Sequence, residues 1–196
     1  MTQPAKRTPQ RPKVSGRAKL ELVRAGSVGV HLESPDTTRA NARPDLTSQV
    51  EKFHEIAREL PPLFERHYRE IALDQDSIPL DPDWDRYLQM SIVGMLRVTT
   101  ARAGDTLAGY IFNLVGPHLH YRSTLFANLE MFWLDPVYRG GSFSLHWFRA
   151  NADMLRELGV KRVTVETKNG YMDGRVGLIF KRLGYKPIET VWARTL

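Results

Sequence analysis

The chain is organised around the segment Phe132-Trp-Leu-Asp-Pro-Val-Tyr-Arg-Gly-Gly-Ser-Phe-Ser-Leu-His146. Residues 126–134 are rich in aromatic and aliphatic types, which predicts a buried strand. Asp135-Pro136 ends that strand, because proline offers no donor to a sheet. Apolar residues then recur at helical spacing, at Leu145, Phe148, Ala152 and Leu155. The segment therefore predicts a strand, a turn of small residues and the first turn of a helix.

The turn Arg139-Gly-Gly-Ser-Phe-Ser144 carries a functional prediction. A helix leaves its first backbone N–H groups without intrahelical partners, and its dipole adds partial positive charge there. A phosphate or diphosphate is a natural occupant of such a site. Glycine-rich turns also join strands to helices without binding anything, so the turn alone leaves both interpretations open.

Composition excludes several classes of protein. The 196 residues are 42% hydrophobic, which is enough for a core of one domain with an appendage. The absence of cysteine excludes disulfides, a thiolate nucleophile and a cysteine-ligated zinc site. No apolar run approaches the roughly 20 residues that span a bilayer, and no apolar core follows the basic N-terminus as in a secretory signal. We expect no membrane association and a cytoplasmic location.

Most of the formal net charge of +6 lies in residues 1–45, which hold nine Lys or Arg against four Asp or Glu. We predict that residues 1–45 are a basic, proline-containing arm and linker, and that residues 46–196 are the folded domain. Two alternating runs within residues 20–33 suggest short strands. The arm suits a polyanion or an acidic protein face, and equally a solvated extension.

Periodicity and turn residues predict an α/β (α+β) domain. The first half predicts a helix over 47–59, capped by Thr47 or Ser48, and a second helix over 63–73. An acidic loop follows over 74–85. Strands over 94–103 and 106–115 then form a hairpin that turns at Gly104-Asp105, and a polar loop covers 116–124. The second half reads as strand 126–134, a helix ending at Leu158-Gly159, strand 161–168, a turn at Asn169-Gly170, a helix from Asp173 to Leu183, and a last strand over 186–196.

This order of elements, with Arg139-Gly-Gly-Ser-Phe-Ser144 after a strand ending in Asp-Pro, resembles the GNAT superfamily of acyl-CoA-dependent N-acyltransferases. The family pattern is Arg or Gln, two residues, Gly, one residue, then Gly or Ala. Arg139 matches it, whereas Ser142 and Ser144 stand at the two small positions. Supporting segments are Leu107-Ala-Gly-Tyr110, Leu158-Gly-Val160 and Leu183-Gly-Tyr185. The resemblance implies a mixed, mostly antiparallel central sheet flanked by helices.

Three further segments resemble a group of GNAT-like proteins encoded by tailed bacteriophages. They are His67-Tyr68, Leu80-Asp-Pro-Asp-Trp84 and Pro117-His-Leu-His-Tyr-Arg-Ser123. This narrower resemblance would place the protein in host cytoplasm or in a virion.

The resemblance implies acetyl-CoA as co-substrate. Its diphosphate would lie on the amides of Gly140, Gly141, Ser142, Phe143 and Ser144, beside Arg139. Its pantetheine would lie between strands 126–134 and 161–168. The chemistry would be aminolysis of a thioester, which needs a base, a donor to the oxyanion and a proton for the leaving thiolate. The donor would be a backbone N–H near Trp133 or Leu134.

Glu130 is the candidate base, since it is the carboxylate of an otherwise apolar strand and burial would raise its pKa. Its alternative is a charge that faces solvent or pairs with Arg122. His118 and His120 are alternative bases, and no third ligand accompanies them to hold a metal.

The acid is the weak point of the resemblance. Phe180 stands where the family usually has a tyrosine that protonates the thiolate, and Asp173 and Val176 replace residues usual earlier on that helix. Tyr185 and Tyr171 are the nearby phenols.

Two main hypotheses follow. The first is an acetyl-CoA-dependent N-acetyltransferase whose amine acceptor, on a small molecule or a protein, the sequence does not identify. The second is a non-catalytic GNAT-fold virion or assembly protein that docks on a partner through its arm. Sequence-independent nucleic-acid binding by the arm is a weaker third reading. A homo-oligomer is among the options, and the sequence favours no oligomeric state.

Overall fold

A computed structural model describes residues 45–168 and 174–195, all of which belong to one compact unit. In this part of the chain, a sheet of five strands runs in the order β1-β2-β3-β4-β5. The strands are β1 (Leu46–Glu51), β2 (Leu96–Ala103), β3 (Thr106–His118), β4 (Tyr121–Leu134) and β5 (Arg162–Val165). Neighbouring strands pair antiparallel except β4 and β5, which are parallel. The mixed, mostly antiparallel sheet flanked by helices is confirmed.

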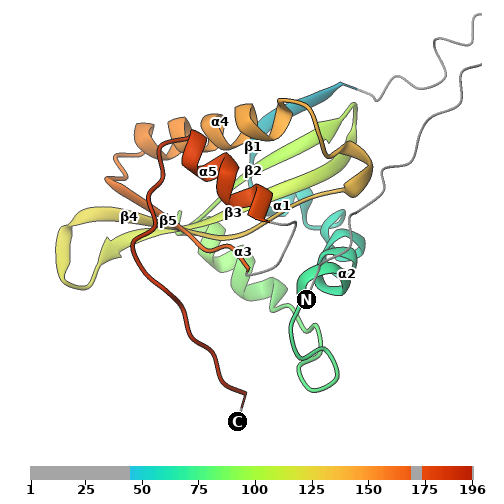
Figure 1. Ribbon diagram of the computed structural model, residues 1–196, viewed down its shortest axis with the longest axis horizontal. Coiled ribbons are helices and arrows are strands. Elements are labelled where there is room, and N and C mark those ends of the chain that lie inside the picture. Colours follow the sequence, from blue (N-terminus) through green and yellow to red (C-terminus); the bar gives the residue numbers. More distant parts are fainter. Residues whose placement is uncertain (1–44, 169–173, 196) are drawn as a thin grey trace, which may run out of the picture. The chain divides into compact units, whose positions relative to one another are not determined.

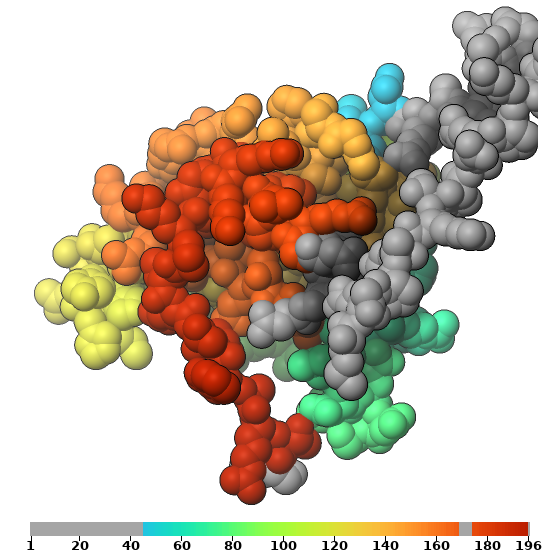
Figure 2. All heavy atoms as spheres, in the orientation of Figure 1, coloured from blue at the N-terminus to red at the C-terminus, as the bar shows by residue number. Residues whose placement is uncertain are grey.

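Helices cover both faces of the sheet (Figure 1). One face carries α1 (Phe53–Ile56), α2 (Leu60–Ile71) and α3 (Trp84–Ile92), and the other carries α4 (Phe143–Glu157) and α5 (Arg175–Arg182). Figure 2 shows the second face, where α5 and residues 185–195 lie in front. None of the helices in the described ranges is long and apolar enough to cross a bilayer.

The two faces have separate apolar cores. On the α1–α3 face, Phe53, Phe64, Tyr110 and Phe112 form a buried aromatic cluster, with ring centroids of Phe64 and Tyr110 5.2 Å apart. On the α4–α5 face, Phe132, Phe148 and Phe180 pack edge to face, with the Phe148 and Phe180 centroids 5.0 Å apart. Apolar side chains alternate between these cores along β3 and β4, as expected for strands buried on both faces.

Four secondary-structure predictions are wrong. Residues 46–51 form β1 and not the start of a helix, because they pair with β2 from Leu46↔Ala103 to Glu51↔Val98. Residues 84–92, for which no helix was predicted, form α3. Asp83 caps this helix by accepting a hydrogen bond from the Arg86 N–H at 2.8 Å.

The other two errors concern strand pairing. The loop predicted over 116–124 is the tip of a longer hairpin, since pairing of β3 with β4 continues to His118↔Tyr121. The strand predicted over 186–196 is absent from the described residues 186–195, which pair with no described strand. The predicted turn at Asn169-Gly170, the cap at Asp173 and the arm over 1–44 lie outside the described residues.

Candidate functional site

The strands β4 and β5 pair over only part of β4. Their register runs from Phe126↔Arg162 to Leu129↔Val165 and then stops, while β4 continues to Leu134. The register between β3 and β4 also shifts at this point, from Asn113↔Leu129 to Phe112↔Met131, so Glu130 is the extra residue of a β-bulge. Residues 130–134 therefore leave the β5-facing edge of β4 without a described strand partner.

The amide of Leu134 faces this unpaired edge. The Asp135 N–H donates to the Ala108 carbonyl of β3 at 2.9 Å, and strand amides alternate in direction. The Leu134 N–H must then point away from β3. Of the two predicted oxyanion donors, the alternation favours Leu134 over Trp133. Gly109 fixes this end of β4 closely to β3, because a Cβ there would lie 2.5 Å from the Trp133 carbonyl oxygen.

The turn that follows β4 is exposed at residues 140–142. Asp135 begins a short 3-10 turn, η2 (Pro136–Tyr138), by accepting a hydrogen bond from the Val137 N–H at 3.1 Å. Gly140 and Gly141 have φ of 114° and 65°, which glycine adopts without strain. The first hydrogen bond of α4 runs from the His146 N–H to the Ser142 carbonyl at 3.2 Å. Among the described residues, no acceptor binds the amides of Gly140, Gly141 and Ser142, which precede α4, so these donors are available at its N-terminus.

Arg139 holds this turn against α2. Its guanidinium binds both carboxylate oxygens of Glu70, and its Nε donates to the Leu134 carbonyl at 2.7 Å. The Trp133 indole N–H donates to the same Glu70 carboxylate at 2.7 Å. Both side chains of the Arg139–Glu70 pair are 22% exposed. Arg139 is thus bound bidentately within the protein at the start of the turn.

His67 continues this network into the core. Its Nδ1 lies 2.8 Å from the Tyr110 hydroxyl, and its ring stacks on Trp133. Burial lowers the pKa of His67 from 6.5 to about 4, Glu70 opposes the change, and the charges of Arg139 and Lys168 add to it. Burial also raises the pKa of Tyr110. His67 is therefore a buried residue packed among the rings of Tyr110 and Trp133.

The His67 pKa predicts a loss of stability in weak acid. The unfolded chain binds more protons than the folded protein between the unfolded pKa of 6.5 and the folded pKa of about 4, so stability falls as pH drops through this window. From pH 8 to pH 4.5 the histidine should cost about 2.5 kcal/mol. Urea unfolding of wild type and His67→Gln across this range should give curves that diverge by that amount. Parallel curves would show that His67 does not titrate below its ordinary pKa.

The predicted catalytic residues do not all meet. Glu130 is exposed, and the burial expected of it is wrong. It accepts a hydrogen bond from the Asn128 amide at 3.3 Å, and the described residues include no ion pair between it and Arg122. His120 lies at the tip of the β3–β4 hairpin, roughly 30 Å along the strand from Glu130. The structure therefore does not bring His120 to the turn.

Tyr185 lies directly beyond α5. Its N–H donates to the Phe180 carbonyl at 3.0 Å, and its ring packs on Phe180 with centroids 5.2 Å apart. Burial raises the pKa of Tyr185, so the phenol keeps its proton at neutral pH. Phe180 is itself buried between Phe132 and Phe148. Tyr171 lies outside the described residues.

Comparison with solved structures finds the same fold in other proteins. An aminoglycoside acetyltransferase from an uncultured soil metagenomic sample matches with a TM-score of 0.63 at 8% identity, over 78% of this chain and 99% of that chain. The ribosomal-protein-alanine N-acetyltransferase from Brucella melitensis biovar Abortus matches at 0.58 and 12% identity, over 78% and 99%. The described domain has the GNAT fold.

A third GNAT-fold match is a predicted acetyltransferase from Clostridium acetobutylicum, solved with acetyl-CoA. Its TM-score is 0.56 at 9% identity, over 77% of this chain and 96% of that chain. A scan against protein-family models finds no match, and a search of curated proteins finds none either. The GNAT-fold likeness at these identities concerns the backbone arrangement.

Sequence reasoning missed Glu70 and the pairing that orients Arg139. Glu70 reads as one charge on the polar face of its helix, and its partner lies 69 positions away. Nothing local in the sequence marks such a contact. In the described ranges, no group of three or more His, Asp or Glu side chains is arranged to hold a metal.

Proposed function

We propose that this domain is an acetyl-CoA-dependent N-acyltransferase. The observation that carries the proposal is the juxtaposition of two features at the end of β4. One is the exposed run of Gly140, Gly141 and Ser142, whose amides have no described acceptor, and the other is the edge of β4 that β5 leaves unpaired beyond Leu129. The first suits a diphosphate and the second an extended arm bearing amide groups.

The residues present fit this co-substrate. A Cβ built on Gly141 would meet nothing within 4 Å, so the approach to the amides is clear. Gly140, Gly141 and Ser142 are exposed, and α4 has no acidic side chain in its first turn. Arg139 positions the turn, because its hydrogen bonds to Glu70 and Leu134 hold the turn in place. Acetyl-CoA would supply a thioester carbonyl open to attack by an amine.

A cleft beside Glu130 suits the amine. It has a volume of about 280 Å³ and lies between α3 and β4, where Asp81, Asp83, Tyr87 and Glu130 are among its lining residues. The three carboxylates outnumber the one arginine of this cleft, Arg86, and would attract an ammonium group. Glu130 would take the proton that the nitrogen must lose before attack. The Leu134 N–H would donate to the carbonyl oxygen as charge develops there. We propose that the protonated phenol of Tyr185 donates its proton to the departing sulfur.

Calorimetry with acetyl-CoA tests the proposal. We expect micromolar binding by the wild type. Ser142→Glu should weaken it at least about tenfold, because a carboxylate would occupy the place of the diphosphate. Ser123→Glu makes the same charge change on an exposed serine at the far end of β4 and should bind as the wild type does. Absence of heat with the wild type would reject the function.

Turnover tests the chemistry separately. Glu130→Gln should lower kcat by about a hundredfold while leaving acetyl-CoA affinity within about twofold, since Glu130 lies outside the turn. Release of CoA from acetyl-CoA with a panel of primary amines would measure it. Equal rates in the two proteins would remove Glu130 as the base.

The second candidate is a binding module without catalysis. The observation that favours it is Phe180, which is buried and has no proton to give. Micromolar acetyl-CoA binding with no turnover on any amine would select this candidate. Docking through residues 1–45 would then be its proposed means of finding a partner.

A further inference from the structure

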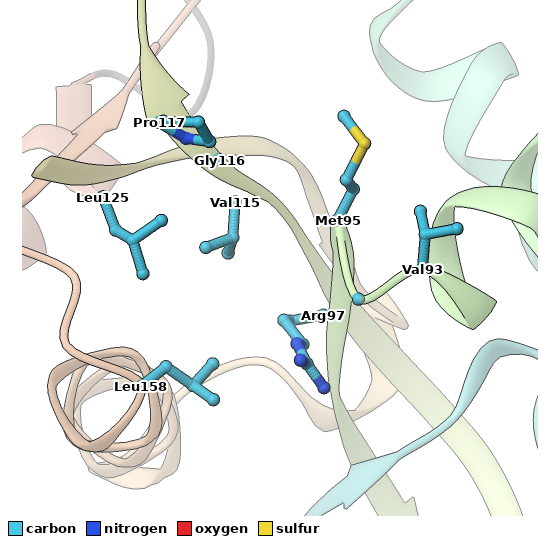
Figure 3. Close-up of a pocket in the computed structure, with 9 residues that line it drawn as sticks. Val93, Met95, Arg97, Val115, Gly116, Pro117, Leu125 and Leu158 are labelled. Carbon is cyan, nitrogen blue, oxygen red and sulfur yellow. The ribbon is translucent and has the colours of Figure 1, made fainter. Parts of the chain in front are cut away.

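A second hollow lies at the opposite end of the sheet from the turn. It has a volume of about 300 Å³, and Arg97, Val115, Pro117, Leu125 and Leu158 are among its lining residues (Figure 3). These residues come from the start of β2, the end of β3, the start of β4 and the C-terminal end of α4. Leu125 is roughly 30 Å along β4 from Leu134, and α4 is about 22 Å long, so the hollow is separate from the proposed acyltransferase site.

The walls of this hollow are apolar apart from one arginine. Val115 is buried, and Leu158 at the C-terminal end of α4 is 37% exposed. Figure 3 shows Arg97 and Leu158 on one side and Val115 and Leu125 on the other, around a common space. A hollow of this size is at the lower end of the range for small-ligand sites.

The Arg97 guanidinium has no ion-pair partner among the described residues. Its Nε is buried and has no hydrogen-bond partner, and within residues 45–168 and 174–195 no carboxylate forms an ion pair with its guanidinium. Gly94 leaves room for the side chain, because a Cβ there would lie 2.9 Å from an Arg97 terminal nitrogen. A buried donor without an acceptor destabilises a protein unless some other group satisfies it.

We propose that this hollow binds a small amphiphilic carboxylate, with the carboxylate on Arg97 and an apolar chain against Val115, Leu125 and Leu158. A carboxylate matches the two-pronged guanidinium and would satisfy its donors. The apolar lining calls for a chain of carbon atoms and not for a free inorganic anion. The arm of this chain is an unsuitable occupant, since residues 1–45 carry nine basic against four acidic residues.

Octanoate is the probe, with octylammonium and 1-octanol as ligands of equal chain length and different head group. Calorimetry on the full chain should give one octanoate site with Kd of about 0.1–1 mM, a range set by the small number of ligand atoms. Both control ligands should bind at least about tenfold more weakly. The proposal is overturned if octanoate does not bind below 10 mM, or if octylammonium binds as tightly.

Two variants locate the site. Arg97→Met removes the guanidinium and retains an aliphatic side chain of similar length. It should weaken octanoate binding at least about tenfold without lowering Tm. Arg149→Met removes an exposed arginine from α4 and should bind octanoate as the wild type does. Leu158→Asp places a carboxylate at the rim of the hollow and should weaken octanoate binding by a similar factor. It locates the site if Arg97→Met does not fold. Wild-type affinity in Leu158→Asp, or in a folded Arg97→Met, would contradict the assignment.

Discussion

Replacing Asn151 with leucine is expected to lower the free energy of unfolding by about 3 kcal/mol. Asn151 is 1% exposed on the sheet-facing side of α4. Its carbonyl oxygen accepts hydrogen bonds from the Thr99 hydroxyl and the Asn113 amide, each at 2.8 Å, and its own amide donates to Asn113 at 3.0 Å. Leucine would leave polar groups of both partners buried and unsatisfied, which is costlier than the loss of the bonds alone.

Urea unfolding measures this cost. Arg149→Leu, on the exposed side of the same helix, should change the free energy of unfolding by less than about 0.5 kcal/mol. The double variant Asn113→Leu/Asn151→Leu should lose less than the sum of the single changes, because it removes both amides together. Strictly additive losses would show that the two amides do not stabilise each other. The network matters for function because it fixes α4, whose N-terminus carries the proposed diphosphate site.

Glu70→Gln is expected to weaken acetyl-CoA binding about tenfold and to cost about 2 kcal/mol of stability. Glutamine retains an oxygen for the Trp133 indole but removes the charge that binds the Arg139 guanidinium. The turn after β4 would lose the Glu70–Arg139 ion pair that links it to α2, and its amides would spend less time in the arrangement that suits a diphosphate. This loss of stability is smaller than that of a fully buried ion pair, because both side chains are 22% exposed.

Glu65→Gln is the matched control for Glu70→Gln. Glu65 lies on the same helix and pairs with Arg69 at 2.7 Å, but both side chains are largely exposed. Its loss should cost less than about 0.5 kcal/mol and leave acetyl-CoA affinity unchanged. The same affinity in Glu70→Gln and Glu65→Gln would contradict the role given to Arg139 as the residue that orients the turn.

Local signals predicted the elements that local chemistry specifies. The β2–β3 hairpin follows from Gly104-Asp105, and α4 and α5 each end two residues before a glycine with positive φ, Gly159 and Gly184. The strand–turn–helix segment around Arg139 was likewise evident, because its residue types change within a few positions. Such signals are independent of how distant parts of the chain meet.

What escaped prediction depends on distant pairing. Leu46–Glu51 holds Thr47 and Ser48, which are typical helix caps, and becomes a strand because β2 offers it a partner. Glu130 was expected to be buried, but it is exposed and stands at a register shift between β3 and β4 that depends on how the two strands pair. The Glu70–Arg139 pair joins a helix to a turn 69 residues away. In each case the deciding contact lies outside any sequence window.

The most direct test of the central claim is a titration of the ¹⁵N-labelled protein with CoA, followed by amide chemical shifts. If the turn after β4 holds the diphosphate of CoA, the largest shifts belong to the amides of Gly140 to Leu145, with a further shift at Leu134 on the unpaired edge of β4. Ser142→Glu should abolish them at the same CoA concentration. No shifts in the wild type, or shifts confined to residues away from the turn and β4, would contradict the account.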